Sequence, residues 1–104
     1  MKHSIYSKSY LFGDLIANLP RKPGEAITAK ALAKRMDLSE AYIRRKINNA
    51  RHFGFPICST NFGYYFSEDP RDIELTINRL KRRISTQVAA IVGLSETIGK
   101  EISE

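Results

Sequence analysis

Length and composition are those of one ordinary folded domain. The chain has 104 residues, of which 42% are hydrophobic and 27% charged, and these proportions exclude a mainly disordered chain. The net charge of +6 favours an anionic partner such as nucleic acid or an anionic membrane surface. Residues 1–60 carry 11 Lys/Arg and 4 Asp/Glu, whereas residues 61–104 carry 6 and 7. We therefore expect any element that binds nucleic acid in the first part of the chain.

The sequence favours a reducing, aqueous compartment. The single cysteine, Cys58, cannot form an internal disulfide, which fits a reducing environment. The longest apolar stretch, residues 88–94, is too short to span a bilayer. We therefore expect a cytoplasmic protein, associated with the nucleoid, that has no membrane partner.

The first half of the chain predicts three helices. The first covers residues 7–19 and ends at Pro20, and an extended stretch at residues 26–27 follows it. Thr28 is the predicted N-cap of a second helix over residues 29–36, and Ser39 that of a third over residues 40–53. The side chains expected to face inward are Tyr10, Leu11, Leu15, Ile16 and Leu19 from the first helix and Leu32 and Met36 from the second.

The second half predicts a hairpin and one long helix. Residues 55–60 and 64–67 are two short strand-like runs, and the residues between them tolerate positive φ. Asp69 as N-cap and Pro70 at the first helical position open the last helix. Three- and four-residue steps continue through Ile73, Ile77, Leu80, Ile84, Val88, Ile91, Leu94, Ile98 and Ile102. So long an apolar stripe predicts a helix that needs a partner along its length.

The segment from residue 29 to residue 47 resembles the helix-turn-helix superfamily. A small residue lets two helices cross closely, and the turn between them needs a residue that tolerates a left-handed backbone. Most members carry glycine at that turn and this chain carries Asp37. The residues that support the resemblance are Ala33, Asp37, Leu38, Ser39, Ile43 and Ile47.

Further along, residues 51–57 and 63–66 resemble the end of the third helix and the hairpin of winged helix domains. The closest type is the N-terminal domain of biotin-operon and DeoR-like repressors and of small phage or plasmid DNA-binding proteins. The resemblance covers about residues 8–70. It implies a mainly α fold with a small β-hairpin, a winged helix-turn-helix, followed by a long C-terminal helix. We expect residues 1–70 to form the DNA-binding domain and residues 71–104 to cover its core and then to dimerise.

The resemblance also implies a set of contacts with double-stranded DNA, because the family's third helix enters the major groove. Arginine can pair with a guanine edge, asparagine with adenine and glutamate with cytosine. The groove-facing residues would be Ser39, Glu40, Tyr42, Arg44, Arg45 and Asn48. Phosphate contacts are expected from Lys30, Lys34, Lys46, Asn49 and Arg51, and a sugar or phosphate contact from Asn61 at the hairpin tip. Thr28 is a further expected DNA-binding residue.

Some of these side chains also have an ordinary structural interpretation. Tyr42 can be a packed aromatic, and residues 44–46 can be a solvated helix face. We expect residues 64–66 to belong to the core, Cys58 to be a small strand residue and His52 to lie at the surface or the core edge. The basic cluster of the last helix is either solvated or in contact with phosphate, and it consists of Arg79, Lys81, Arg82 and Arg83.

The stripe of the last helix predicts self-association. From Ile73 to Ile91 it repeats every 11 residues, a period that favours a nearly straight or slightly right-handed helix pair. Gly93, Ser95 and Gly99 weaken its end, so we expect fraying after about Leu94. A two-fold homodimer would read two half-sites one or two turns of DNA apart. The expected dimer contacts are Ile77, Leu80, Ile84, Val88, Ile91 and Leu94.

The motifs of common enzymes are absent from the sequence. It has no glycine-rich phosphate loop, paired carboxylates or zinc-ligand spacing. We therefore expect no enzyme, no cofactor, no metal and no small-molecule substrate. The leading hypothesis is a sequence-specific transcriptional regulator, most simply a repressor. The alternatives are a phage or plasmid replication or partition accessory protein, and a protein-interaction or inhibitor module that docks through its long helix.

Overall fold

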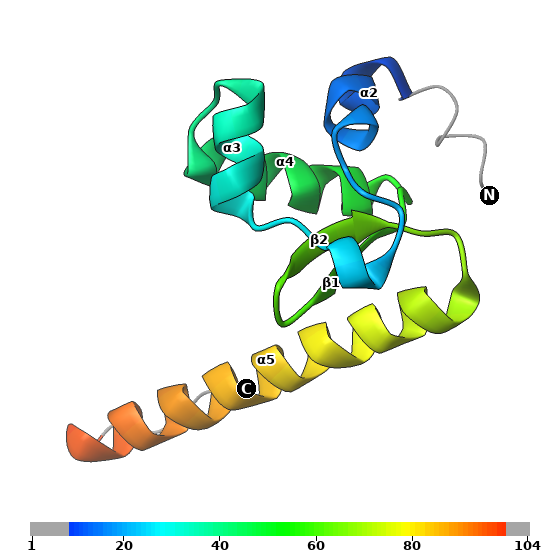
Figure 1. Ribbon diagram of the computed structural model, residues 1–104. Coiled ribbons are helices and arrows are strands. Elements are labelled where there is room, and N and C mark those ends of the chain that lie inside the picture. Colours follow the sequence, from blue (N-terminus) through cyan, green and yellow to red (C-terminus); the bar gives the residue numbers. More distant parts are fainter. Residues whose placement is uncertain (1–8, 100–104) are drawn as a thin grey trace. The chain divides into compact units, whose positions relative to one another are not determined.

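The structure, a computed structural model, describes residues 9–99 of the chain (Figure 1). The predicted fold class is confirmed, because the fold is mainly helical with one antiparallel hairpin and a long C-terminal helix. The first of two units ends at Ile73 and the second begins at Glu74. The elements are α2 (Ser9–Ala17), η1 (Pro23–Glu25), α3 (Ala29–Met36), α4 (Glu40–His52), β1 (Ile57–Thr60), β2 (Gly63–Phe66) and α5 (Pro70–Thr97).

Local hydrogen bonds set where α3 and α4 begin. Thr28 has extended backbone, and its Oγ1 accepts a hydrogen bond from the amide of Ala31 at 3.0 Å. Ser39 does the same for α4, where its Oγ accepts from the amide of Tyr42 at 3.1 Å. Both predicted N-caps are confirmed, and each satisfies an amide that the helix itself leaves without a partner.

The turn between α3 and α4 depends on one left-handed residue. Asp37 has φ 58° and ψ 48°, and its amide donates to the carbonyls of Ala33 and Lys34. The amide of Leu38 then donates to Ala33 at 2.9 Å. These bonds close α3 and redirect the chain into α4, as the predicted left-handed turn requires. Aspartate tolerates this conformation at a modest cost.

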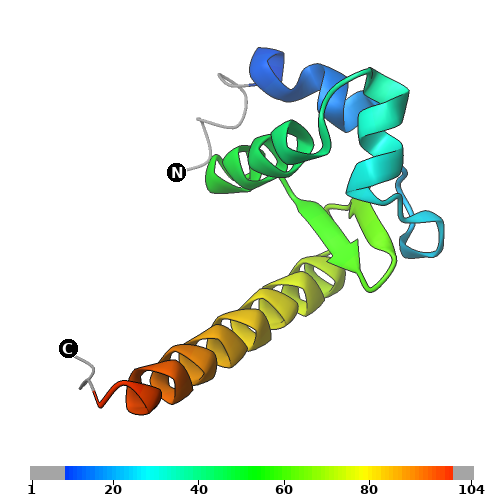
Figure 2. The same cartoon turned by 90° about the vertical axis from the view of Figure 1, so that its left-hand side faces the viewer.

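The core of the first unit lies among α2, α3, α4 and the hairpin, and Figure 2 shows the three helices gathered on one side of the hairpin. The predicted inward face of α2 was wrong at Leu11, which is 39% exposed, whereas Phe12 is 4% exposed. The reason is tertiary: the Phe12 ring lies 6.1 Å from that of Phe53 and 5.4 Å from that of Phe55. The side chain of Tyr10 lies outside the described residues.

The hairpin is joined to the segment before α3. In the hairpin, Ile57 pairs with Phe66 and Thr60 with Gly63. Ile27 and Tyr64 also exchange two backbone hydrogen bonds of 2.9 and 2.7 Å. The predicted extended stretch at residues 26–27 therefore forms an isolated antiparallel β-bridge with β2. Gly63 has φ +148°, and a Cβ there would collide with the Ile27 backbone. Only glycine allows this close approach.

The start of α5 is tied to the end of the hairpin within the first unit. The predicted cap is confirmed, because Asp69 Oδ1 accepts from the amide of Arg71 at 2.9 Å, next to Pro70 at the first helical position. The hydroxyl of Ser67 donates to Asp72 Oδ2 at 2.6 Å and accepts from the amide of Asp69 at 3.1 Å. These bonds explain why the first unit ends a few residues after the predicted boundary at residue 70.

The rest of α5 is one unbroken helix whose apolar stripe is largely exposed, although Leu80 is half-buried. The helix ends at Thr97, three residues beyond the predicted fraying point, so Gly93 is accommodated within it. Ile84 is 61% and Leu94 69% exposed, and Ile77, Val88 and Ile91 are exposed as well. No helix within residues 9–99 has both the length and the apolarity that crossing a bilayer requires.

Candidate nucleic-acid interface

Helix α4 has a buried face and an outward face. Ile43, Ile47 and Ala50 are buried in the core, as predicted for the two isoleucines. At about 100° per residue, the side chains opposite these three belong to one stripe along the helix. That stripe consists of Ala41, Arg45, Asn48 and His52, all exposed. Ala41 and His52 were not among the predicted site residues, although helical spacing from Arg45 identifies them.

Tyr42 lies at the edge of the outward face, between two cations. It is 36% exposed, and its hydroxyl accepts a hydrogen bond from Lys46 Nζ at 3.3 Å. Lys46 Nζ lies 5.5 Å and Arg45 Cζ 5.7 Å from the centre of the Tyr42 ring. The ring therefore packs against the two cations at the surface and is not part of the core.

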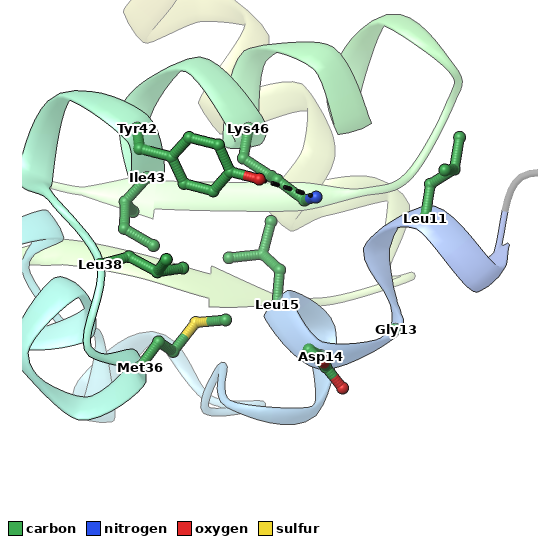
Figure 3. A pocket seen from close by; sticks show the side chains of 9 residues that line it. All are labelled: Leu11, Gly13, Asp14, Leu15, Met36, Leu38, Tyr42, Ile43 and Lys46. Carbon is green, nitrogen blue, oxygen red and sulfur yellow. Dashed lines mark hydrogen bonds between the residues drawn. The ribbon is translucent and has the colours of Figure 1, made fainter.

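A shallow hollow with both polar and apolar lining runs along the edge of α4 that faces α2. It has a volume of about 230 Å³, and Figure 3 shows the side chains of Tyr42 and Lys46 directed toward each other on its rim. A second hollow of about 260 Å³ shares both residues and continues to Asn49 and Phe53. This pair of hollows was not predicted from the sequence, because Leu11 was expected to be buried. The first hollow is lined by Leu11, Gly13, Asp14, Leu15, Met36, Leu38, Tyr42, Ile43 and Lys46.

Arg44 and Arg45 are neighbours on α4 and differ in their partners. Arg44 forms an ion pair with Glu40, with 2.7 Å between its guanidinium nitrogen and the carboxylate oxygen. Both side chains are well exposed, and such a pair contributes only about 0.3–0.5 kcal/mol on a helix surface. In the described part of the chain, no carboxylate lies within ion-pair distance of Arg45 or Lys46. Of these two, Arg45 is therefore the more available to an external anion or base.

Arg51 has a structural role. Its Nε donates to the carbonyl oxygen of Ile57 at 2.7 Å, and its Cζ lies 5.6 Å from the centre of the Tyr64 ring. The residue is only partly exposed. It connects α4 to both strands of the hairpin, an arrangement that only the folded chain reveals. The predicted phosphate contact of Arg51 stays a prediction, and we leave this residue out of the interface proposed below.

The remaining predicted contacts lie at the ends of elements. Thr28 and Ser39 use a lone pair for their caps, which leaves the O–H of each hydroxyl able to donate to a phosphate oxygen. Lys30 and Lys34 on α3 are exposed, as are Asn48 and Asn49 on α4. Asn61 lies at the hairpin tip beside Phe62, which is 78% exposed. Sequence reasoning missed Phe62, although an aromatic residue in a tight turn between strands has little surface to pack against.

The polar groups behind the interface belong to the fold. Tyr65 is buried in β2, and burial, followed by a hydrogen bond with Asp72, raises the pKa of its phenol to about 12. Cys58 is buried in β1, as expected for a small strand residue. His52 is exposed beside Phe53, with 5.4 Å between the ring centres. Among residues 9–99, no three His, Cys, Asp or Glu side chains gather as a metal ion would require.

The structure brings most of the predicted base-contacting side chains together on one helix. Arg44, Arg45 and Asn48 all project from α4, whereas Asn61, predicted as a phosphate contact, belongs to the hairpin. Comparisons of the chain with protein-family models, curated proteins and solved structures returned no match. We therefore base its function on the chemistry of these side chains.

Proposed function

We propose that the chain binds double-stranded DNA as a winged helix-turn-helix, with α4 in the major groove, and regulates transcription, most simply as a repressor. The observation that carries the proposal is the position of Arg45. It projects from the outward face of a capped helix, opposite the buried Ile43 and Ile47, and has no ion-pair partner within the described residues. An arginine in this position can donate two hydrogen bonds to a guanine edge.

The arrangement of elements supports this proposal. The chain runs from α2 through the Ile27 pairing to α3, turns at Asp37 into α4 and continues into the hairpin. This order is the one expected for the family that the sequence resembles. The segment from α3 to the end of α4 carries seven Lys/Arg and two Asp/Glu, which gives a local charge of +5. A charge of that sign attracts the phosphate backbone.

Each exposed side chain of the interface then has a chemical task. Arg45 reads guanine and Asn48 reads adenine. Ser39 and the amides at the positive end of α4 hold a phosphate. Lys30, Lys46 and Asn49 contact further phosphates, which orient the helix without reading sequence. Glu40 holds Arg44 in the free protein, and the hairpin contributes through Asn61 at its tip.

The protein acts as a homodimer in this proposal, and it is found with the nucleoid because that is where its ligand lies. The exposed stripe of α5 supports a second copy as the partner, since large aliphatic side chains gain most from leaving water together. A two-fold dimer reads a site with two-fold symmetry. The contacts assigned to the partner copy are those of Ile77, Leu80, Ile84, Val88, Ile91 and Leu94.

The test begins with duplexes selected by the full-length protein from a random pool. The dissociation constant for the selected site is then measured across a salt series, and it should rise steeply with salt because bound phosphates release counterions. Arg45→Ala should weaken specific binding by about 1–3 kcal/mol, roughly 5- to 150-fold in Kd. Arg21→Ala is the matched control, because it removes the same charge from an exposed site outside α4.

A second variant separates base reading from simple attraction. Arg45→Lys keeps the charge and loses the planar fork, so it should retain non-specific binding and lose preference for the selected site. Equal effects of Arg45→Ala and Arg21→Ala would reject Arg45 as a base reader. A footprint that spreads cooperatively over repeated sites would indicate a replication or partition protein. Failure to bind any duplex at low salt would reject DNA binding and favour a protein-interaction module.

A further inference from the structure

The apolar stripe of α5 is symmetric in sequence about one residue. Ile91 stands three residues from both Val88 and Leu94, and seven residues from both Ile84 and Ile98. All five side chains are exposed. If the 11-residue repeat of the first turns continued, Ser95 and Gly99 would be the next positions of the stripe. The apolar residues are Leu94 and Ile98, so the spacing changes after Ile91. Between residues 84 and 98, the steps between apolar residues are therefore four, three, three and four residues in either chain direction.

Helical geometry places these side chains on one face. At about 100° per residue, Ile84 and Ile98 project within about 20° of Ile91, on opposite sides of it, while Val88 and Leu94 lie about 60° to either side. Ile98 follows α5 directly, and its amide bonds to the carbonyl of Ser95 at 3.3 Å. An antiparallel copy with its two-fold axis at Ile91 would meet this face with matched layers: Ile84 against Ile98, Val88 against Leu94 and Ile91 against itself.

Charge separates the two possible directions of pairing. Four positive side chains lie in one five-residue segment of α5: Arg79, Lys81, Arg82 and Arg83. In a parallel pair the two clusters would lie at the same level, with Lys81 and Arg83 flanking the apolar contact on either side and about 10 Å between helix axes. In an antiparallel pair centred on Ile91 they would be about 24–36 Å apart along the helix. That separation is three or more times the ~8 Å screening length of physiological salt, so the repulsion is much more fully screened than in a parallel pair.

We propose that α5 pairs antiparallel with the α5 of a second copy, with Ile91 at the two-fold axis. The palindromic spacing identifies the second copy as the partner. An antiparallel copy needs the same spacing in both chain directions, whereas an unrelated helix does not. The pairing deepens the homodimer of the proposed function and rests on it for its biological role. It keeps Ile84, Val88, Ile91 and Leu94 as contacts, adds Ile98 and leaves Ile77 and Leu80 outside the matched layers. Its geometry is tested without DNA.

The test uses disulfide trapping in the full-length protein. Ile84→Cys, Ile91→Cys and Ile98→Cys are made separately, and the native Cys58 stays as an internal control because it is buried. Under mild oxidation, Ile91→Cys should form a homodimer disulfide, and a mixture of Ile84→Cys with tagged Ile98→Cys should form a mixed disulfide. Ile84→Cys alone should not cross-link, since its two copies would lie about 21 Å apart along the pair.

Mass in solution provides the second readout. Ile91→Glu should convert the dimer to a monomer, because two like charges would meet at the axis. Ala89→Glu is the matched control on the opposite face of α5 and should remain dimeric. Cross-linking of Ile84→Cys with itself would overturn the proposal in favour of a parallel pair, and a monomeric wild-type chain would exclude the second copy. A mixed 84–98 disulfide in a protein that binds no duplex would confirm the pairing and reject the DNA-binding function.

Discussion

The first unit of the chain and the rest of α5 use the same helical periodicity with opposite results. In the first unit, the apolar residues spaced at three and four residues are buried, as Leu32, Ile43 and Ile47 show. In α5, Ile84 and Leu94 follow the same spacing and remain well exposed. Periodicity thus identifies the side chains that share a face, and only the surrounding elements decide whether the chain itself covers that face.

The two regions therefore depend on different contacts. Helices α2, α3 and α4 and the hairpin bury one another's apolar faces, and Arg51 and the Ile27 pairing link α4, the hairpin and the segment before α3. The first unit then needs no other molecule to cover its core. The later turns of α5 carry side chains of the same kind without such cover, and a helix of this type gains its stability from what packs on it.

The largest effect that tests this contrast is expected from a matched pair of leucine substitutions. Leu32→Ala should lower the free energy of unfolding by about 2–5 kcal/mol, because it leaves a cavity in a fully buried site. Leu75→Ala removes the same atoms from an exposed position on α5 and should cost under about 1 kcal/mol. Denaturant unfolding measures both. Similar losses from the two variants would show that the regions do not differ in burial.

The next effect concerns the buried phenol at the end of the first unit. The pKa of Tyr65 is raised from 10.0 to about 12, so the folded chain holds this proton more tightly than the unfolded chain. Its contribution to stability is complete below pH 10 and is lost as the pH rises toward 12. Between pH 10 and about pH 11.5, the wild type should lose up to about 2 kcal/mol more than Tyr65→Phe, at about 1.4 kcal/mol per pKa unit.

The control for this phenol is Asp72→Asn, which removes the carboxylate that accepts its hydrogen bond and keeps the burial. Its pH dependence should lie between those of the wild type and Tyr65→Phe. Unfolding followed across the alkaline range gives the comparison. Identical curves for the wild type and Tyr65→Phe would contradict the raised pKa.

A smaller effect comes from the cap of α4. Ser39→Ala removes the acceptor of the Tyr42 amide and should cost about 1 kcal/mol. Ser85→Ala, an exposed serine within α5, is the control and should leave the unfolding of the first unit unchanged. Thermal unfolding distinguishes the two, and an unchanged midpoint for Ser39→Ala would mean that the cap hydrogen bond adds nothing.

The smallest effect on stability, and an informative one on function, is expected from Glu40→Gln. The exposed ion pair with Arg44 contributes little, so stability should change by less than about 0.5 kcal/mol. Removing a negative charge beside the outward face should tighten DNA binding roughly two- to fivefold, which is about 0.5–1 kcal/mol. Weaker and less selective binding would instead show that Glu40 reads a cytosine directly.

Short-range chemistry explains what was predictable from the amino-acid order alone. The caps at Thr28 and Ser39 and the left-handed turn at Asp37 all involve partners within four residues along the chain. Such contacts form whenever the local backbone does, so residue type and spacing suffice to predict them. The inward direction of Ile43 and Ile47 follows in the same way from the helical period.

The tertiary structure decided what depends on distant partners. Phe12 rather than Leu11 enters the core because Phe53 and Phe55 arrive there from the other end of α4. Arg51 turns toward the hairpin because the carbonyl of Ile57 lies within 2.7 Å. Spacing along the chain predicts neither contact, since both form only after the chain has folded back on itself. The amino-acid order therefore determined the helices and the buried faces of α3 and α4, whereas packing decided the buried face of α2 and which side chains were left for a partner.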